Sequence, residues 1–176
     1  MEVSHGGGIF TTRILQREGA DARALVAENA RVMEALGMVR GVSHTEFIKA
    51  RSDGRIYFLE TSARVGGAHI VELVESATGL NLWAEWAKVE LSAEYEVVVP
   101  REEYAALLIS LARQERPDTS AYNAPEVVWR LVQDHHAGLI VRSESYQRVA
   151  ELRREYEGRF TEDFYAYEPP KDKPSH

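Results

Sequence analysis

The sequence predicts an α+β fold in which helices flank an antiparallel sheet. Runs of β-branched and aromatic residues come in neighbouring pairs, as hairpin strands do, instead of alternating one by one with helices. Between these pairs, apolar residues recur at helical spacing. The chain has 176 residues, of which 44% are hydrophobic, so it is long enough and apolar enough to form a core.

A short strand and a helix are expected first. Residues 9–15 combine β-branched and aromatic side chains after the glycines at 6–8, as strands do. Asp21 stands in the position of a helix N-cap, and Gly37 stands where a glycine commonly follows a helix. The residues between them predict one helix, whose apolar face carries Ala22, Leu25, Val26, Val32, Met33 and Leu36.

Two strands, 42–51 and 55–63, are expected to form a hairpin around Ser52-Asp53-Gly54. Alternate side chains of a strand point to the same face. The shared faces are therefore expected to carry His44, Glu46 and Ile48 on the first strand, and Ile56, Phe58, Glu60, Ser62 and Arg64 on the second.

The length of the hairpin loop decides whether these two faces coincide. A three-residue loop places Glu46 opposite Glu60, and Gly54 suits the left-handed residue that ends such a loop. A two-residue turn places Glu46 opposite Thr61 instead and sends Glu60 to the reverse face. The glycine favours the first register, and both stay open at this point.

Two helices are expected after the hairpin. Gly66 and Gly67 end its second strand, and the helix that follows ends at Gly79. Asn81 is expected to cap the next helix, which carries Trp83 and Trp86.

The second half of the chain is expected to add strands and one more helix. Strands are predicted over 95–99, 127–132 and 139–141, whereas 104–112 fits either a helix or a strand. A last helix is predicted between Ser143 and Gly158, before a solvated tail over 169–176.

Composition excludes several classes of protein. The chain has no cysteine, which removes disulfide scaffolds, thiolate zinc sites and cysteine nucleophiles. A net charge of −7 disfavours nucleic acid and anionic membrane surfaces as partners. Neither a transmembrane segment nor a secretory signal is evident, so a cytoplasmic location is expected.

The hairpin carries the strongest chemical signal. In the three-residue register two carboxylates, Glu46 and Glu60, meet across neighbouring strands, which is unfavourable unless a proton or a cation neutralises them. Magnesium or manganese suits two carboxylates with a nearby hydroxyl such as that of Ser62, and Arg64 adds a fixed positive charge. Gly66 and Gly67 lead into a helix N-terminus, which favours an anion. The alternative is a pair of exposed strand glutamates that serve only as solvated surface residues or ion-pair partners.

These residues resemble the ATP-grasp superfamily. The segment Gly41-Val42-Ser43-His44-Thr45-Glu46-Phe47-Ile48, a short hairpin, and then Tyr57-Phe58-Leu59-Glu60-Thr61-Ser62-Ala63-Arg64-Val65-Gly66-Gly67 are similar to the C-terminal half of an ATP-grasp domain. The family pattern is Glu-x-Asn-x-Arg on the second strand, and here it reads Glu-x-Ser-x-Arg. The helix ending at Gly37 and the run 77–82 resemble the carboxylate–amine ligases similar to L-amino-acid ligases.

The resemblance implies a site that binds ATP and Mg2+ (or Mn2+). It implies Glu46, Glu60 and Ser62 as metal ligands, with serine in the place of the usual asparagine. It implies that Arg64 steadies the substrate carboxylate or the developing acyl phosphate. The residues implied to contact the nucleotide are Ile48, Glu60, Gly66 and Gly67.

The resemblance also implies a domain plan and a missing part. Residues 1–91 are expected to form the C-terminal subdomain of an ATP-grasp fold, and residues 92–168 a small α+β domain like the one that follows ATP-grasp in biotin-carboxylase-like enzymes. No lysine precedes Lys49, so the phosphate-binding lysines of the family's N-terminal half are expected on another part of a longer enzyme.

The implied reaction activates a small carboxylate as an acyl phosphate and joins it to an amine. The alternative is a non-catalytic binding module that retains the half-fold, and a homo-oligomer is also left open.

Overall fold

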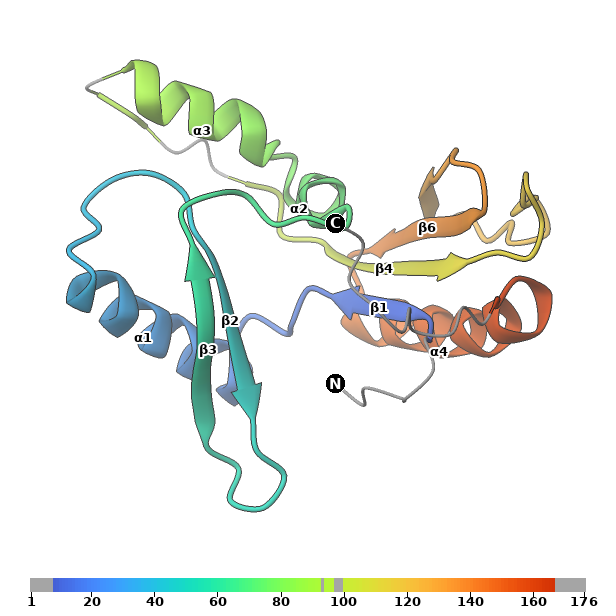
Figure 1. Ribbon diagram of the computed structural model, residues 1–176, viewed down its shortest axis with the longest axis horizontal. Coiled ribbons are helices and arrows are strands. Elements are labelled where there is room, and N and C mark those ends of the chain that lie inside the picture. The colour runs from blue at the N-terminus through green and yellow to red at the C-terminus, as the bar shows by residue number, and fades with distance from the viewer. Residues whose placement is uncertain (1–7, 93, 97–99, 167–176) are drawn as a thin grey trace, which may run out of the picture. The chain divides into compact units, whose positions relative to one another are not determined.

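The computed structural model describes residues 8–92, 94–96 and 100–166, which form an α+β protein as the sequence predicted (Figure 1). The chain divides into two compact units. Unit 1 consists of Met1–Arg13 and Glu103–His176, and unit 2 consists of Ile14–Glu102. Among the described residues, no helix is long and apolar enough to cross a membrane.

Unit 2 contains a β-hairpin and helices. Its elements are α1 (Ala20–Ala35), β2 (His44–Lys49), β3 (Ile56–Ser62), α2 (Ile70–Thr78) and α3 (Leu82–Leu91). The antiparallel strands β2 and β3 form a two-stranded sheet, and α1 packs against β3. None of the residues of α1 is buried.

The ends of these helices follow the glycine and asparagine signals with one exception. Gly37 and Gly79 have positive φ angles of 66° and 79°, and the side chain of Asn81 accepts hydrogen bonds from the backbone N–H groups of Trp83 and Ala84 in the first turn of α3. The prediction of Asp21 as an N-cap is wrong, because the N-cap is Gly19 and the Asp21 carboxylate instead pairs with Lys49 at 2.6 Å.

Unit 1 is a four-stranded antiparallel sheet with one helix packed on it. Its strands are β1 (Phe10–Arg13), β4 (Tyr104–Leu111), β5 (Val127–Arg130) and β6 (His136–Ser143), in the order β1-β4-β6-β5. The helix α4 (Tyr146–Asp163) packs on β4 and β6. Alternate residues of these strands meet α4 in a core that includes Leu108, Leu139, Val141, Tyr156 and Phe160.

Strand pairing in unit 1 settles one alternative that the sequence left open and corrects one grouping. Residues 104–111 are a strand, since they pair along their whole length with β6. β1 pairs with β4, so it belongs to this sheet, whereas the expected domain plan grouped it with the hairpin in residues 1–91.

The last helix also differs at both ends. α4 is capped by Ser145, not Ser143, and it continues past Gly158 to Asp163. Burial of Phe160, which is fully inaccessible to solvent, offsets the roughly 1 kcal/mol that a glycine costs inside a helix. The strand predicted over 95–99 is not found at Tyr95 and Glu96, and residues 97–99 lie outside the described residues.

Candidate functional site

The two glutamates of the hairpin lie directly opposite each other. Glu46 on β2 pairs with Glu60 on β3, and His44 pairs with Ser62. This is the pairing that was expected for a three-residue loop. On the reverse face, the hydroxyls of Thr45 and Thr61 are 2.8 Å apart, which agrees with this register.

The hairpin reaches this register by a route that the sequence did not predict. The backbone N–H of Ala50 donates to the carbonyl of Arg55, so the loop has four residues rather than three. Lys49 therefore pairs with Ile56, and Phe47 pairs with Phe58. A β-bulge at Leu59 then shifts the pairing by one residue and restores the Glu46–Glu60 pair.

The bulge changes which side chains share the face of the two glutamates. Phe58, predicted on that face, lies on the reverse face and contacts Phe47 edge-on, with ring centroids 6.0 Å apart. Tyr57 takes its place and pairs with Ile48. The expectation for Phe58 and Ile56 was therefore wrong, because strict alternation does not hold across a bulge.

Tyr57 lies on the same face as the two glutamates and was not predicted there from the sequence. Its hydroxyl donates to the carboxylate of Asp53 at 2.8 Å. This hydrogen bond raises the pKa of the Tyr57 phenol, and the pKa of Asp53 is lowered first by the backbone N–H of Arg55 and then by Tyr57. Ile48 and Tyr57 are 53% and 45% exposed, so together they form an open apolar patch beyond the glutamates.

The two glutamate side chains have different surroundings. An oxygen of Glu46 lies 3.3 Å from Nε2 of His44. Within the described part of the chain, the side chain of Glu60 has no hydrogen bond or ion pair. The carboxylate of Glu60 is thus exposed and unneutralised, opposite a second carboxylate.

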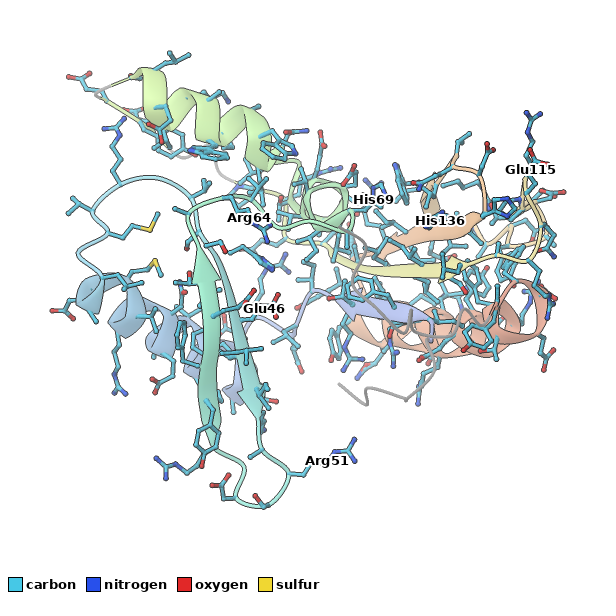
Figure 2. All side chains as sticks on the ribbon, in the orientation of Figure 1. Glu46, Arg51, Arg64, His69, Glu115 and His136 are labelled. Atoms are coloured by element: carbon cyan, nitrogen blue, oxygen red, sulfur yellow. The ribbon has the colours of Figure 1, made fainter. Side chains whose placement is uncertain are left out.

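Arg64 lies beyond the end of β3 rather than on its face. The strand ends at Ser62, and the N–H of Arg64 turns back to the Ser62 carbonyl at 2.9 Å. The guanidinium donates to the carbonyl of Val65. Figure 2 shows Glu46 on the hairpin and Arg64 in the segment that follows it, so the expectation that Arg64 continues the strand face is corrected by this turn.

The two glycines that follow differ in how closely other atoms surround them. Gly66 is buried, and a Cβ there would lie 3.0 Å from Nδ1 of His44 and 3.1 Å from Cγ2 of Ile70. Gly67 is exposed, with nothing within 4 Å of a Cβ. Only Gly66 is therefore required to be small by its neighbours.

The donor set of this face fits a hard divalent cation. Two opposed carboxylates and the hydroxyl of Ser62 are oxygen ligands of the kind that magnesium and manganese prefer. Within the described ranges, no three His, Cys, Asp or Glu side chains converge on one point. Glu46 and Glu60 thus make an incomplete set, which water or other oxygen donors would complete.

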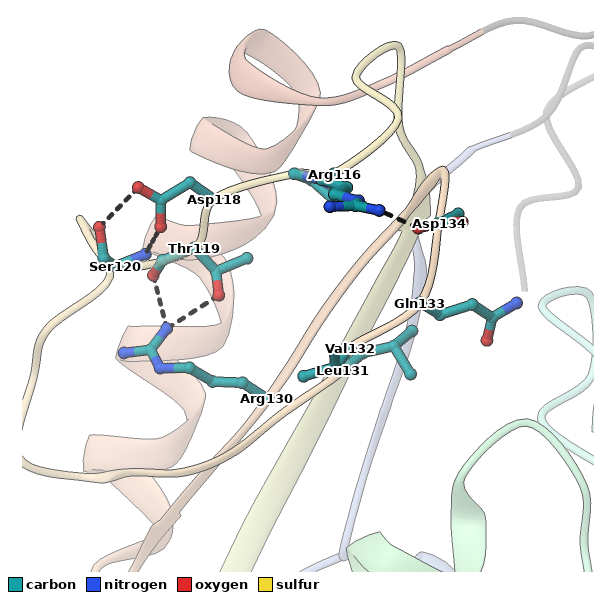
Figure 3. A pocket seen from close by; sticks show the side chains of 10 residues that line it. Arg116, Asp118, Thr119, Ser120, Arg130, Leu131, Val132, Gln133 and Asp134 are labelled. Atoms are coloured by element: carbon teal, nitrogen blue, oxygen red, sulfur yellow. Dashed lines mark hydrogen bonds and ion pairs between the residues drawn. The ribbon is translucent and has the colours of Figure 1, made fainter.

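A hollow of about 550 Å3 lies in unit 1, between the loop at 116–120 and the segment 130–134 (Figure 3). Its polar groups bind one another. Arg130 donates to Thr119 and to the carbonyl of Tyr122, and Asp118 accepts from Ser120. These contacts hold the loop in place, and none of them points to a ligand.

Comparison with solved structures shows the fold. An L-amino acid ligase from Bacillus licheniformis matches 93% of this chain with a TM-score of 0.66 and 18% identity. An N5-carboxyaminoimidazole ribonucleotide synthetase from Thermotoga maritima matches 88% with a TM-score of 0.64 and 13% identity. Biotin carboxylase from Campylobacter jejuni matches 90% with a TM-score of 0.56 and 14% identity.

These matches confirm the resemblance at the level of the fold. The chain has the fold of part of an ATP-grasp ligase, and it spans 44%, 45% and 39% of the three chains, respectively. No protein-family model matches the sequence, and no curated protein sequence matches it significantly.

Proposed function

We propose that unit 2 supplies one side, or wall, of the active site of an ATP-grasp ligase, and that this wall binds the cation. The observation that carries the proposal is the direct opposition of Glu46 and Glu60 on β2 and β3, with Glu60 unneutralised. Opposed carboxylates on an exposed hairpin are unfavourable by themselves, and a bound cation removes the cost.

Each side chain on the face of the two glutamates has a proposed role. Glu46 and Glu60 hold Mg2+ or Mn2+, and Ser62 adds a hydroxyl in place of an amide oxygen. When bound, the cation neutralises charge on the ATP phosphates and on the attacking carboxylate. Ile48 and its neighbour Tyr57 offer apolar surface to the adenine.

The residues after β3 are proposed to handle anionic groups. Arg64, released from the Val65 carbonyl, is long enough to turn toward a substrate carboxylate or an acyl phosphate, where its guanidinium provides a fixed positive charge. Gly66 and Gly67 let the backbone approach the phosphates. The reaction proposed for the complete enzyme is activation of a carboxylate as an acyl phosphate, followed by attack of an amine.

The complete site needs a second wall. Residues 1–48 contain no lysine to bind phosphate, and the solved chains that match are more than twice as long as the aligned part. We propose that a lysine-bearing half completes the site, within a longer polypeptide or as a separate chain. Since the reaction consumes ATP, we expect it in the cytoplasm.

The test is ADP release by the complete enzyme, with a mixture of L-amino acids as probe because one matching structure is named an L-amino acid ligase. Glu60→Gln should lower the rate at least a hundredfold, about 3 kcal/mol of transition-state stabilisation. Glu34→Gln, at an exposed position on α1, is the matched control and should leave the rate unchanged. Wild-type ADP release by Glu60→Gln would end the proposed role of Glu60 in cation binding, whereas no ADP release by the wild type would favour a non-catalytic binding module.

A further inference from the structure

The imidazole of His44 lies between Glu46 and Gly66, next to the pair of glutamates. Its side chain is 23% exposed, whereas that of Glu46 is 44% exposed. The imidazole lies against the Cα of Gly66 on one side, since a Cβ there would approach Nδ1 and Cε1 to 3.0 and 3.2 Å. On the other side, Nε2 lies 3.3 Å from a carboxylate oxygen of Glu46.

We propose that His44 is a positioning residue that holds the Glu46 carboxylate in place for the cation, and that Gly66 is glycine because His44 needs its space. This inference rests on the function proposed above and adds two residues to it. A ligating carboxylate gains affinity when a neighbouring group fixes its orientation before the cation arrives.

The different neighbours of the two glutamates make the assignment specific. A glutamate side chain on an exposed strand has several rotamers, and ordering it on cation binding costs conformational entropy. Glu46 has a half-buried neighbour that restricts it, whereas Glu60 has none among the described residues. Glu46 is therefore the preorganised ligand of the pair, and Glu60 is the ligand that adjusts.

The atoms in contact predict which substitutions of His44 and Gly66 preserve the contact with Glu46. Because His44 touches Glu46 through Nε2, the amide nitrogen of glutamine can reach the same place, whereas the shorter asparagine reaches only the position of Nδ1. His44→Gln should therefore still position the Glu46 carboxylate, whereas His44→Asn and His44→Ala should not. Gly66→Ala should resemble His44→Ala, because the added methyl displaces the imidazole.

The first measurement needs no metal. Side-chain scalar couplings of Glu46 by NMR should report one dominant rotamer in the wild-type chain and in His44→Gln, and averaged rotamers in His44→Ala and Gly66→Ala. Circular dichroism checks that each variant is folded. Averaged couplings in the wild type would overturn the proposal.

The second measurement is the affinity for Mn2+ alone, from the EPR signal of the free ion at one fixed pH. His44→Ala and Gly66→Ala should each weaken binding about tenfold, and Gly66→Ala should cause no further loss when added to His44→Ala. Wild-type affinity in His44→Ala, or additive losses in the double variant, would overturn the proposal.

The two measurements separate the possible failures. If Glu46 is ordered by His44 but the wild-type chain does not bind Mn2+, or if Glu60→Gln binds it equally well, the proposed cation site fails and the positioning role fails with it. If Mn2+ binding depends on Glu60 but not on His44, only the positioning role fails.

Discussion

Glu60→Gln should change the stability of the chain in opposite directions without and with magnesium. The substitution keeps the size of the side chain and removes one of the two opposed charges of the hairpin. Without metal, this relieves a repulsion and should stabilise the fold.

The size of this effect follows from the geometry of a cross-strand pair. Cβ atoms of directly opposed residues are about 5 Å apart, and the Glu46 side chain is 44% exposed, so the dielectric constant of water applies. Coulomb's law then gives ~0.8 kcal/mol, which screening at physiological salt lowers to ~0.4 kcal/mol. The variant should be more stable by this amount in EDTA, and by ~0.7 kcal/mol at ~0.01 M salt.

Magnesium should reverse the order of the two proteins. Binding to the folded wild type at a concentration of about ten times Kd adds ~1.4 kcal/mol to its free energy of unfolding. Glu60→Gln should gain little, because it lacks the charge that holds the ion.

Urea denaturation followed by circular dichroism, with EDTA or magnesium at constant ionic strength, measures both differences, and Glu34→Gln serves as the control variant. The reasoning is refuted if Glu60→Gln is the less stable protein in EDTA. It is also refuted if magnesium stabilises the wild type and Glu60→Gln equally.

Three further predictions concern the scaffold. Phe160→Ala should cost about 3–5 kcal/mol of unfolding free energy in urea melts, because Phe160 is fully buried; a cost below 1 kcal/mol would contradict the described core. Asn81→Ala should cost about 1 kcal/mol by removing the cap of α3, and an unchanged melting temperature would contradict that cap. The hydrogen bond from Arg148 lowers the pKa of Glu126, so this pair stabilises the fold above the unfolded pKa of Glu126 and stops doing so as pH falls through the folded pKa. Glu126→Gln should therefore flatten the loss of stability on acidification, and an unchanged acid profile would contradict the pairing.

Local signals in the sequence were sufficient for the C-terminal ends of α1 and α2 and for the cap of α3. Gly37, Gly79 and Asn81 act within one turn of the chain, so their roles follow from residue type alone. The Glu46–Glu60 pair was predicted correctly, although the four-residue loop and the bulge at Leu59 were not. These two departures each shift the register by one residue and cancel at the glutamates.

Features that depend on distant residues were not predictable. The assignment of β1 to the sheet of unit 1 depends on pairing with β4, nearly a hundred residues later. The continuation of α4 past Gly158 depends on the core that buries Phe160. The contact of His44 with Gly66 joins a strand to a loop, and no spacing rule in the sequence indicates it.

The most direct test of the central claim is where Mn2+ binds on the chain. In a 15N-labelled sample, substoichiometric Mn2+ should broaden first the amide signals around Glu46, Glu60 and Ser62, and Glu60→Gln should abolish this broadening while Glu34→Gln retains it. Broadening centred elsewhere, or broadening of the hairpin that survives Glu60→Gln, would contradict the claim that these opposed carboxylates bind the cation.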